Sequence, residues 1–185
     1  MNGSFKLKAS IMKPLKPVLM LSALCFLLSA CRKEINNTTT KQTEKSQSEK
    51  TKVVPFKGEY LTTNQPLAGP PLVKQKVTGM GEAASLGNSM FIAYATVNVA
   101  TPPPFVVTGT ATFIAADGSE FYTEFTGTNT PKGDGTASIL VTHHVTGGTG
   151  RFANASGTVA ASGYTILAEA KGSISYDGTI VTALD

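Results

Sequence analysis

Two adjacent histidines, His143 and His144, are the residues of this sequence best suited to acid–base chemistry, because imidazole alone titrates near neutral pH without help. Neighbouring residues of a strand point to opposite faces, so the two rings are poorly placed to bind one metal ion. His143 shares its parity with Val141 and Val145, and we expect it to face inward while His144 faces water. His143 is therefore a candidate ligand-binding residue; the alternative is a hydrogen-bonded histidine of the core.

Arg151 is the second candidate, and it lies in the glycine-rich segment 145–157. Its guanidinium group could bind an anionic ligand; alternatively, its stem packs against the loop and its N–H groups bond loop carbonyls. Glu120 and Glu124 alternate with phenylalanines, which places them in water, and no serine lies in the context of a nucleophile elbow. The sequence therefore assigns no catalytic residue, no metal ligand and no cofactor.

The run Val-Thr-Gly-Gly-Thr-Gly at residues 145–150 imitates a dinucleotide-binding fingerprint. That motif requires a strand before it, a helix after it and a complete βαβ unit. Residues 158–161 have the composition of another strand, and only 35 residues follow Gly150. We therefore do not expect a dinucleotide site.

The first 30 residues have the pattern of a secretory leader. Residues 1–17 hold four lysines and no acidic residue, and residues 18–28 are almost wholly apolar. This apolar run is too short to span a bilayer, which takes about 20 residues. The leader ends in Leu-Ser-Ala-Cys at residues 28–31, which resembles the cleavage signal of bacterial lipoproteins.

The lipoprotein resemblance implies cleavage after residue 30 and acyl chains on Cys31. Membrane lipid would then be a partner of the chain through this acylated cysteine. Since no Asp follows Cys31, the resemblance implies the outer membrane of the cell envelope, facing either the periplasm or the outside. The alternative is an ordinary secreted protein with a chance cysteine.

Charge and cysteine content narrow the possible partners. The formal charge is +4, and cleavage removes the four lysines of the leader, which leaves a mature charge of 0. No cluster of Lys and Arg is retained that would favour nucleic acid. Cys25 leaves with the leader, so beyond Cys31 there is no thiol for a disulfide, a nucleophile or a metal site.

Composition divides the mature chain into two parts. Residues 32–52 contain one aliphatic side chain, Ile35, which is too little apolar surface to offset the entropy of ordering the segment. We expect residues 31–54 to be the lipidated cysteine and a disordered tether, and residues 55–185 to form one folded domain.

The clearest element in the folded part is a hairpin over residues 105–127. Val107, Ala111 and Phe113 share one parity of its first arm, and Phe121 and Phe125 share one parity of its second. Between the arms lies an Asp-Gly pair at 117–118, the turn that a tight hairpin favours. Such alternation indicates one wall in the core and one in water.

Further strands are expected over residues 56–62, 72–81, 88–99, 136–146, 156–164 and 171–182. Asp134-Gly135 opens one of them, the prolines at 102–104 mark a loop, and Asp177-Gly178 marks a bend or a final turn. Short strands with regular turn signals predict an all-β fold, a single eight-stranded antiparallel β-barrel. A barrel of this size is filled by side chains or holds one small ligand.

The stretch Gly-Gly-Thr-Gly-Arg-Phe-x-x-Ala-x-Gly at residues 147–157 resembles a signature of the allene oxide cyclase-like and dirigent-like barrels. The resemblance extends over most of residues 56–182 and implies a calycin-like eight-stranded barrel. It carries over no catalytic residue. The glycines also have a structural explanation, because Gly147, Gly148 and Gly150 allow a tight connection with positive φ, and Phe152 can close the barrel end.

Three functions remain open on these grounds. We favour a non-enzymatic binding module that holds a small apolar ligand in the barrel or an envelope partner on its surface. A structural or surface-coat role would fit the Thr- and Gly-rich exterior. A cyclase-like or isomerase-like enzyme follows from the family resemblance alone and requires an open pocket with a polar group such as His143.

Replacing Cys31 with Ala should move the protein from the membrane fraction to the soluble fraction, because two or more acyl chains hold a protein at a bilayer where one chain binds only transiently. Cell fractionation with metabolic acyl labelling tests this, and Cys25→Ala is the matched control that keeps both label and attachment. Acyl label on the Cys31→Ala chain would contradict lipidation at this residue.

Overall fold

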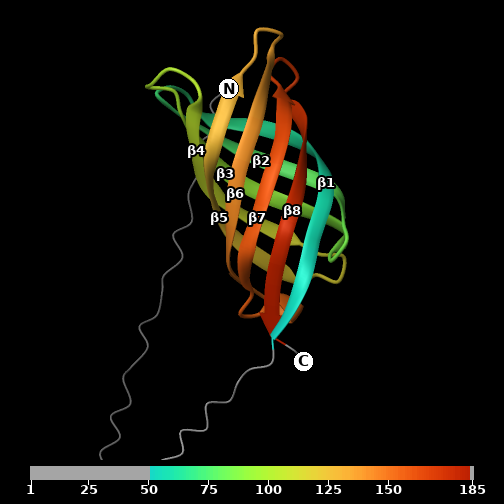
Figure 1. The fold of residues 1–185 in the computed structure, drawn as a ribbon. Coiled ribbons are helices and arrows are strands. Elements are labelled where there is room, and N and C mark those ends of the chain that lie inside the picture. Colours follow the sequence, from blue (N-terminus) through green and yellow to red (C-terminus); the bar gives the residue numbers. More distant parts are fainter. Residues whose placement is uncertain (1–50, 184–185) are drawn as a thin grey trace, which may run out of the picture. The chain divides into compact units, whose positions relative to one another are not determined.

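The computed structural model describes residues 51–183, which form eight antiparallel strands closed into a barrel (Figure 1). Each strand pairs with its neighbours in chain order, and the last strand pairs with the first. The strands are β1 (Thr51–Ala68), β2 (Leu72–Ala83), β3 (Gly87–Asn98), β4 (Phe105–Ile114), β5 (Glu120–Pro131), β6 (Thr136–Gly148), β7 (Ser156–Ile166) and β8 (Lys171–Ala183). A single 3-10 turn, η1 (Gly150–Phe152), lies between β6 and β7. The all-β eight-stranded fold expected from the sequence is confirmed.

β1 differs most from the sequence expectation. It begins at Thr51, inside the segment assigned to the tether, and ends at Ala68 rather than near residue 62. Its first residues continue the ladder with the end of β8, where Thr51 faces Ala183. The barrel therefore begins at residue 51 rather than 55. The leader, Cys31 and the tether up to residue 50 lie outside the described residues.

The three Asp-Gly pairs do not behave alike. Those at 117–118 and 134–135 occupy turns, as expected, and in each turn the Asp carboxylate accepts the backbone N–H two residues later, at 3.0 Å. The pair at 177–178 forms no bend, because β8 continues through it to Ala183. Gly178 is needed there for close strand packing, since a Cβ would lie 2.5 Å from the Thr158 carbonyl oxygen.

Strict alternation places one face of every strand in a shared interior. On β4 and β5 the inward residues are those that the sequence predicted, and Phe113 and Phe121 are almost fully buried. Glu124 points outward and is exposed. No helix within residues 51–183 is long and apolar enough to cross a bilayer.

One end of the barrel, here called the closed end, is filled by aromatic rings. It carries the β2–β3, β4–β5 and β6–β7 connections together with the start of β1 and the end of β8. Phe113 and Phe121 stack with ring centroids 4.5 Å apart, and Phe56 meets both edge-on at 5.4 and 5.3 Å. Phe152 of η1 is buried and contacts Phe121 at 5.4 Å, as expected for a residue that closes this end.

The glycine-rich connection at this end corrects one expectation. Gly147 and Gly150 have positive φ values of 141° and 56°, but Gly148 does not. Gly148 is required for space instead, because a Cβ would lie 2.2 Å from the Glu120 carbonyl oxygen. The other end of the barrel, here called the mouth, carries the β1–β2, β3–β4, β5–β6 and β7–β8 connections, including the proline loop at 102–104.

Truncating Phe113 to Ala should lower the free energy of unfolding by about 3–5 kcal/mol, since the side chain is almost fully buried among other rings. Val106→Ala on the same strand, where half of the side chain is exposed, should change it by less than about 1 kcal/mol. Urea denaturation of both variants measures the difference. Equal losses would show that the aromatic end is not the main source of stability.

Candidate functional site in the barrel lumen

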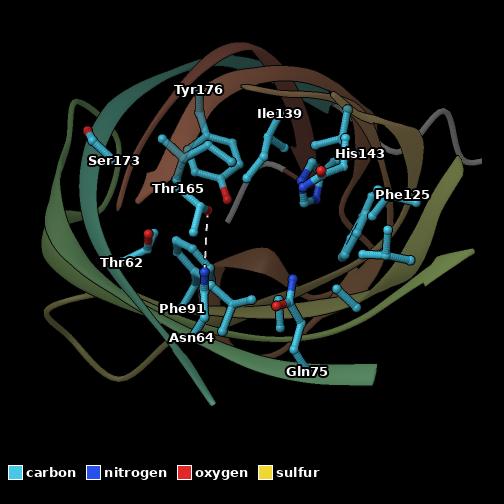
Figure 2. A pocket seen from close by; sticks show the side chains of 18 residues that line it. Thr62, Asn64, Gln75, Phe91, Phe125, Ile139, His143, Thr165, Ser173 and Tyr176 are labelled. Carbon is cyan, nitrogen blue, oxygen red and sulfur yellow. Dashed lines mark hydrogen bonds between the residues drawn. The ribbon is translucent and has the colours of Figure 1, made fainter. Parts of the chain in front are cut away.

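Between the aromatic closed end and the mouth, the barrel encloses a cavity lined by 18 residues (Figure 2). The centres of water-sized molecules can occupy about 60 Å³ of it. Because one water needs about 10–15 Å³ by this measure, the space admits a few waters or part of one small molecule. Its walls are mostly small or apolar, with Ala93, Ala95, Val97, Val107 and Val141 among them.

The cavity adjoins a wider space at the mouth, here called the vestibule, of about 240 Å³. The residues that line both spaces are Asn64, Gln75, Val97, Asn129 and Thr165. Asn64 donates a hydrogen bond from Nδ2 to Thr165 Oγ1 at 3.3 Å, drawn as a dashed line in Figure 2. A set of amide and hydroxyl groups therefore lies between the vestibule and the apolar cavity.

His143 projects from β6 into this lumen and is only 3% exposed, whereas His144 is exposed on the outer face. The predicted orientations of the two rings are thus confirmed. His143 Nδ1 shares a 2.9 Å hydrogen bond with the buried hydroxyl of Thr123 on β5. Burial, assisted by the charge of His144, lowers the pKa of His143 to about 4. The ring is therefore neutral at physiological pH.

Tyr176 of β8 is the lumen residue that the sequence reasoning missed. It is 4% exposed, and its ring centroid lies 5.4 Å from that of His143. Figure 2 shows its hydroxyl directed toward the middle of the lumen. Burial, with a smaller contribution from the charge of Tyr60, raises the pKa of Tyr176 well above its usual value. Its parity with Ile174 and Ile180 on β8 was the signal that could have placed it inside.

Arg151 lies at the closed end and does not line the lumen, so the structure does not bring the two candidate residues together. Its Nε lies 3.2 Å from a carboxylate oxygen of Asp117, and its guanidinium carbon is 4.9 Å from the centre of the Phe152 ring. The backbone N–H of Ser119 and, less strongly, Arg151 lower the pKa of Asp117. Arg151 therefore bonds a carboxylate of the neighbouring loop rather than loop carbonyls.

The chemistry available in the lumen is that of neutral hydrogen-bonding groups. No charged side chain is among the cavity-lining residues. Glu120 accepts a hydrogen bond from the Tyr122 hydroxyl at 3.1 Å and, like Glu124, does not line the lumen. Within residues 51–183, no group of three His, Cys, Asp or Glu side chains is arranged to hold a metal ion.

The burial of neutral His143 predicts that acid destabilises the barrel. The usual imidazole pKa is 6.5 and that of His143 is about 4, so the unfolded chain takes up the proton first as the pH falls. The free energy of unfolding should therefore decrease by about 3 kcal/mol between about pH 6.5 and pH 4 from this group, with no further contribution below.

Urea denaturation across this pH range measures the effect. His143→Gln should remove this part of the pH dependence, whereas His144→Gln should keep most of it, because burial is the larger cause. The same pH dependence in all three proteins would refute the assignment to His143.

Comparison with known proteins bears on the fold. No protein-family model and no curated protein matches the chain. Among solved structures, the pterocarpan synthase dirigent protein GePTS1 is similar at 13% sequence identity, over 74% of this chain and 93% of that chain, with a TM-score of 0.50. At this identity the similarity concerns the fold alone. This chain therefore has a dirigent-like β-barrel fold, as the glycine-rich signature at 147–157 implied.

Proposed function

We propose that this barrel is a non-enzymatic binding module that holds a small, mainly apolar molecule in its lumen. The observation that carries the proposal is the uneven filling of the interior. Phenylalanine rings pack the closed end, whereas alanine and valine side chains such as Ala93, Ala95 and Val107 line the space toward the mouth. These small side chains leave an apolar cavity next to the vestibule at the mouth.

Two phenylalanines that line the cavity lie over facing glycines rather than across the lumen. A Cβ on Gly79 would meet the Phe91 ring at 2.0 Å, and one on Gly109 would meet the Phe125 ring at 2.5 Å. Within each pair the two residues are register partners on adjacent strands: Gly79 of β2 lies opposite Phe91 of β3, and Gly109 of β4 lies opposite Phe125 of β5. Each glycine provides room for a ring against the wall, which keeps the middle of the lumen open.

The ionisation of the two lumen groups supports binding over proton transfer. A general acid or base works best when its pKa lies near the working pH. Burial moves the pKa of His143 down to about 4, which makes it a weak base, and raises that of Tyr176, which makes it a weaker acid. Both groups are better suited to neutral hydrogen bonds than to proton transfer.

We further propose that the barrel acts at the outer membrane, attached through lipid on Cys31. The leader pattern and the Leu-Ser-Ala-Cys signal at residues 28–31 support this location. A ligand with an apolar body is in keeping with it, since such molecules partition into or across the envelope.

Substituting Gly79 with Ala should close the lumen, because the new methyl group displaces the Phe91 ring from the wall. We expect the full chain to bind cumene, a neutral hydrocarbon of one ring, in a saturable NMR titration, and Gly79→Ala to bind it at least about tenfold more weakly. Gly133→Ala, where a Cβ meets nothing within 4 Å, is the matched control. Absence of cumene binding to the unsubstituted chain would refute the lumen as an apolar site.

A further inference from the structure

Two buried tyrosines stand side by side in the barrel, with ring centroids 5.5 Å apart, and only one has its hydroxyl satisfied. The Tyr60 hydroxyl lies 2.8 Å from Ser89 Oγ, and Ser89 in turn donates to the Gly87 carbonyl. Among residues 51–183, the Tyr176 hydroxyl makes no hydrogen bond, and it faces the cavity. A hydroxyl that faces a cavity without a protein partner is free to donate a hydrogen bond to whatever enters the lumen.

His143 adds a second polar group close to Tyr176, with ring centroids 5.4 Å apart. Its Nδ1 is occupied by Thr123, which leaves Nε2 as the nitrogen available to a ligand. The ring is held by its contacts with Phe125 at 4.8 Å and Phe113 at 5.9 Å between centroids. The cavity lining therefore includes a phenolic hydroxyl and an imidazole nitrogen that lie close together.

The lumen offers nothing to balance a charge. Its polar lining consists of amides, hydroxyls and the neutral imidazole, without Lys, Arg, Asp or Glu. An ion that entered would lose its hydration without gaining a counter-ion, and this penalty is large. Carboxylate, phosphate and ammonium groups are thereby disfavoured in the cavity itself.

We propose that the molecule bound in the lumen is uncharged, has an apolar body about one ring wide, and carries a carbonyl or hydroxyl oxygen that accepts a hydrogen bond from Tyr176. The inference rests on the proposed binding function and specifies the class of ligand. Tyr176 is then the residue that distinguishes an oxygen-bearing ligand from a hydrocarbon of the same size, with His143 beside it.

Three probes with equal numbers of non-hydrogen atoms test this in the full chain: cumene, acetophenone and benzoate. Affinities are measured by NMR titration at pH 7, and the folded state of every variant is checked from its spectrum. The unsubstituted chain should bind acetophenone at least about 100-fold more tightly than benzoate. Tyr176→Phe should lower the affinity for acetophenone about threefold to tenfold more than the affinity for cumene, because only the ketone loses a hydrogen bond.

Tyr60→Phe is the matched control, since Tyr60 does not line the cavity and its hydroxyl is already bonded. It should leave the ratio of acetophenone to cumene affinity unchanged. Binding of cumene shows that the lumen accepts apolar molecules. If cumene binds, the inference is overturned when Tyr176→Phe leaves this ratio unchanged, and also when benzoate binds as tightly as acetophenone. If neither cumene nor acetophenone binds, the proposed function fails as well.

Discussion

Closure of the ladder between β1 and β8 is the constraint on which the rest of this structure depends. Once the sheet closes, the inward side chains of all eight strands share one interior of fixed volume. Large rings such as Phe56, Phe113 and Phe121 occupy one end of that volume. The small residues toward the mouth do not fill the remaining space, and a cavity results.

The polar groups of the interior follow from the same closure. Most buried polar atoms of a protein interior are hydrogen bonded, and here two inward pairs are joined across strands: Thr123 with His143, and Tyr60 with Ser89. Both pairs consist of neutral groups, and burial keeps them so. Tyr176 differs only in that its hydroxyl lies at the edge of the cavity, where a ligand rather than a strand can meet it.

Local sequence patterns were sufficient for the fold class, for the hairpin over β4 and β5, and for the inward orientation of His143, because strand alternation is a local property. They failed where the answer depends on pairing between distant strands. The length of β1 is set by its register with β8, and Gly178 is a close-packing residue only because Thr158 lies opposite. Tyr176 became a candidate for the same reason, since only closure places it beside His143.

The direction in which the chain enters and leaves the barrel has a practical consequence. Thr51 and Ala183 face each other at the closed end, opposite the loops that surround the mouth. A fusion partner, an affinity tag or a solid support attached next to Thr51 or Ala183 is thus connected at the pole remote from the entrance. A barrel immobilised through either of these residues on a sensor surface has its entrance oriented toward the analyte.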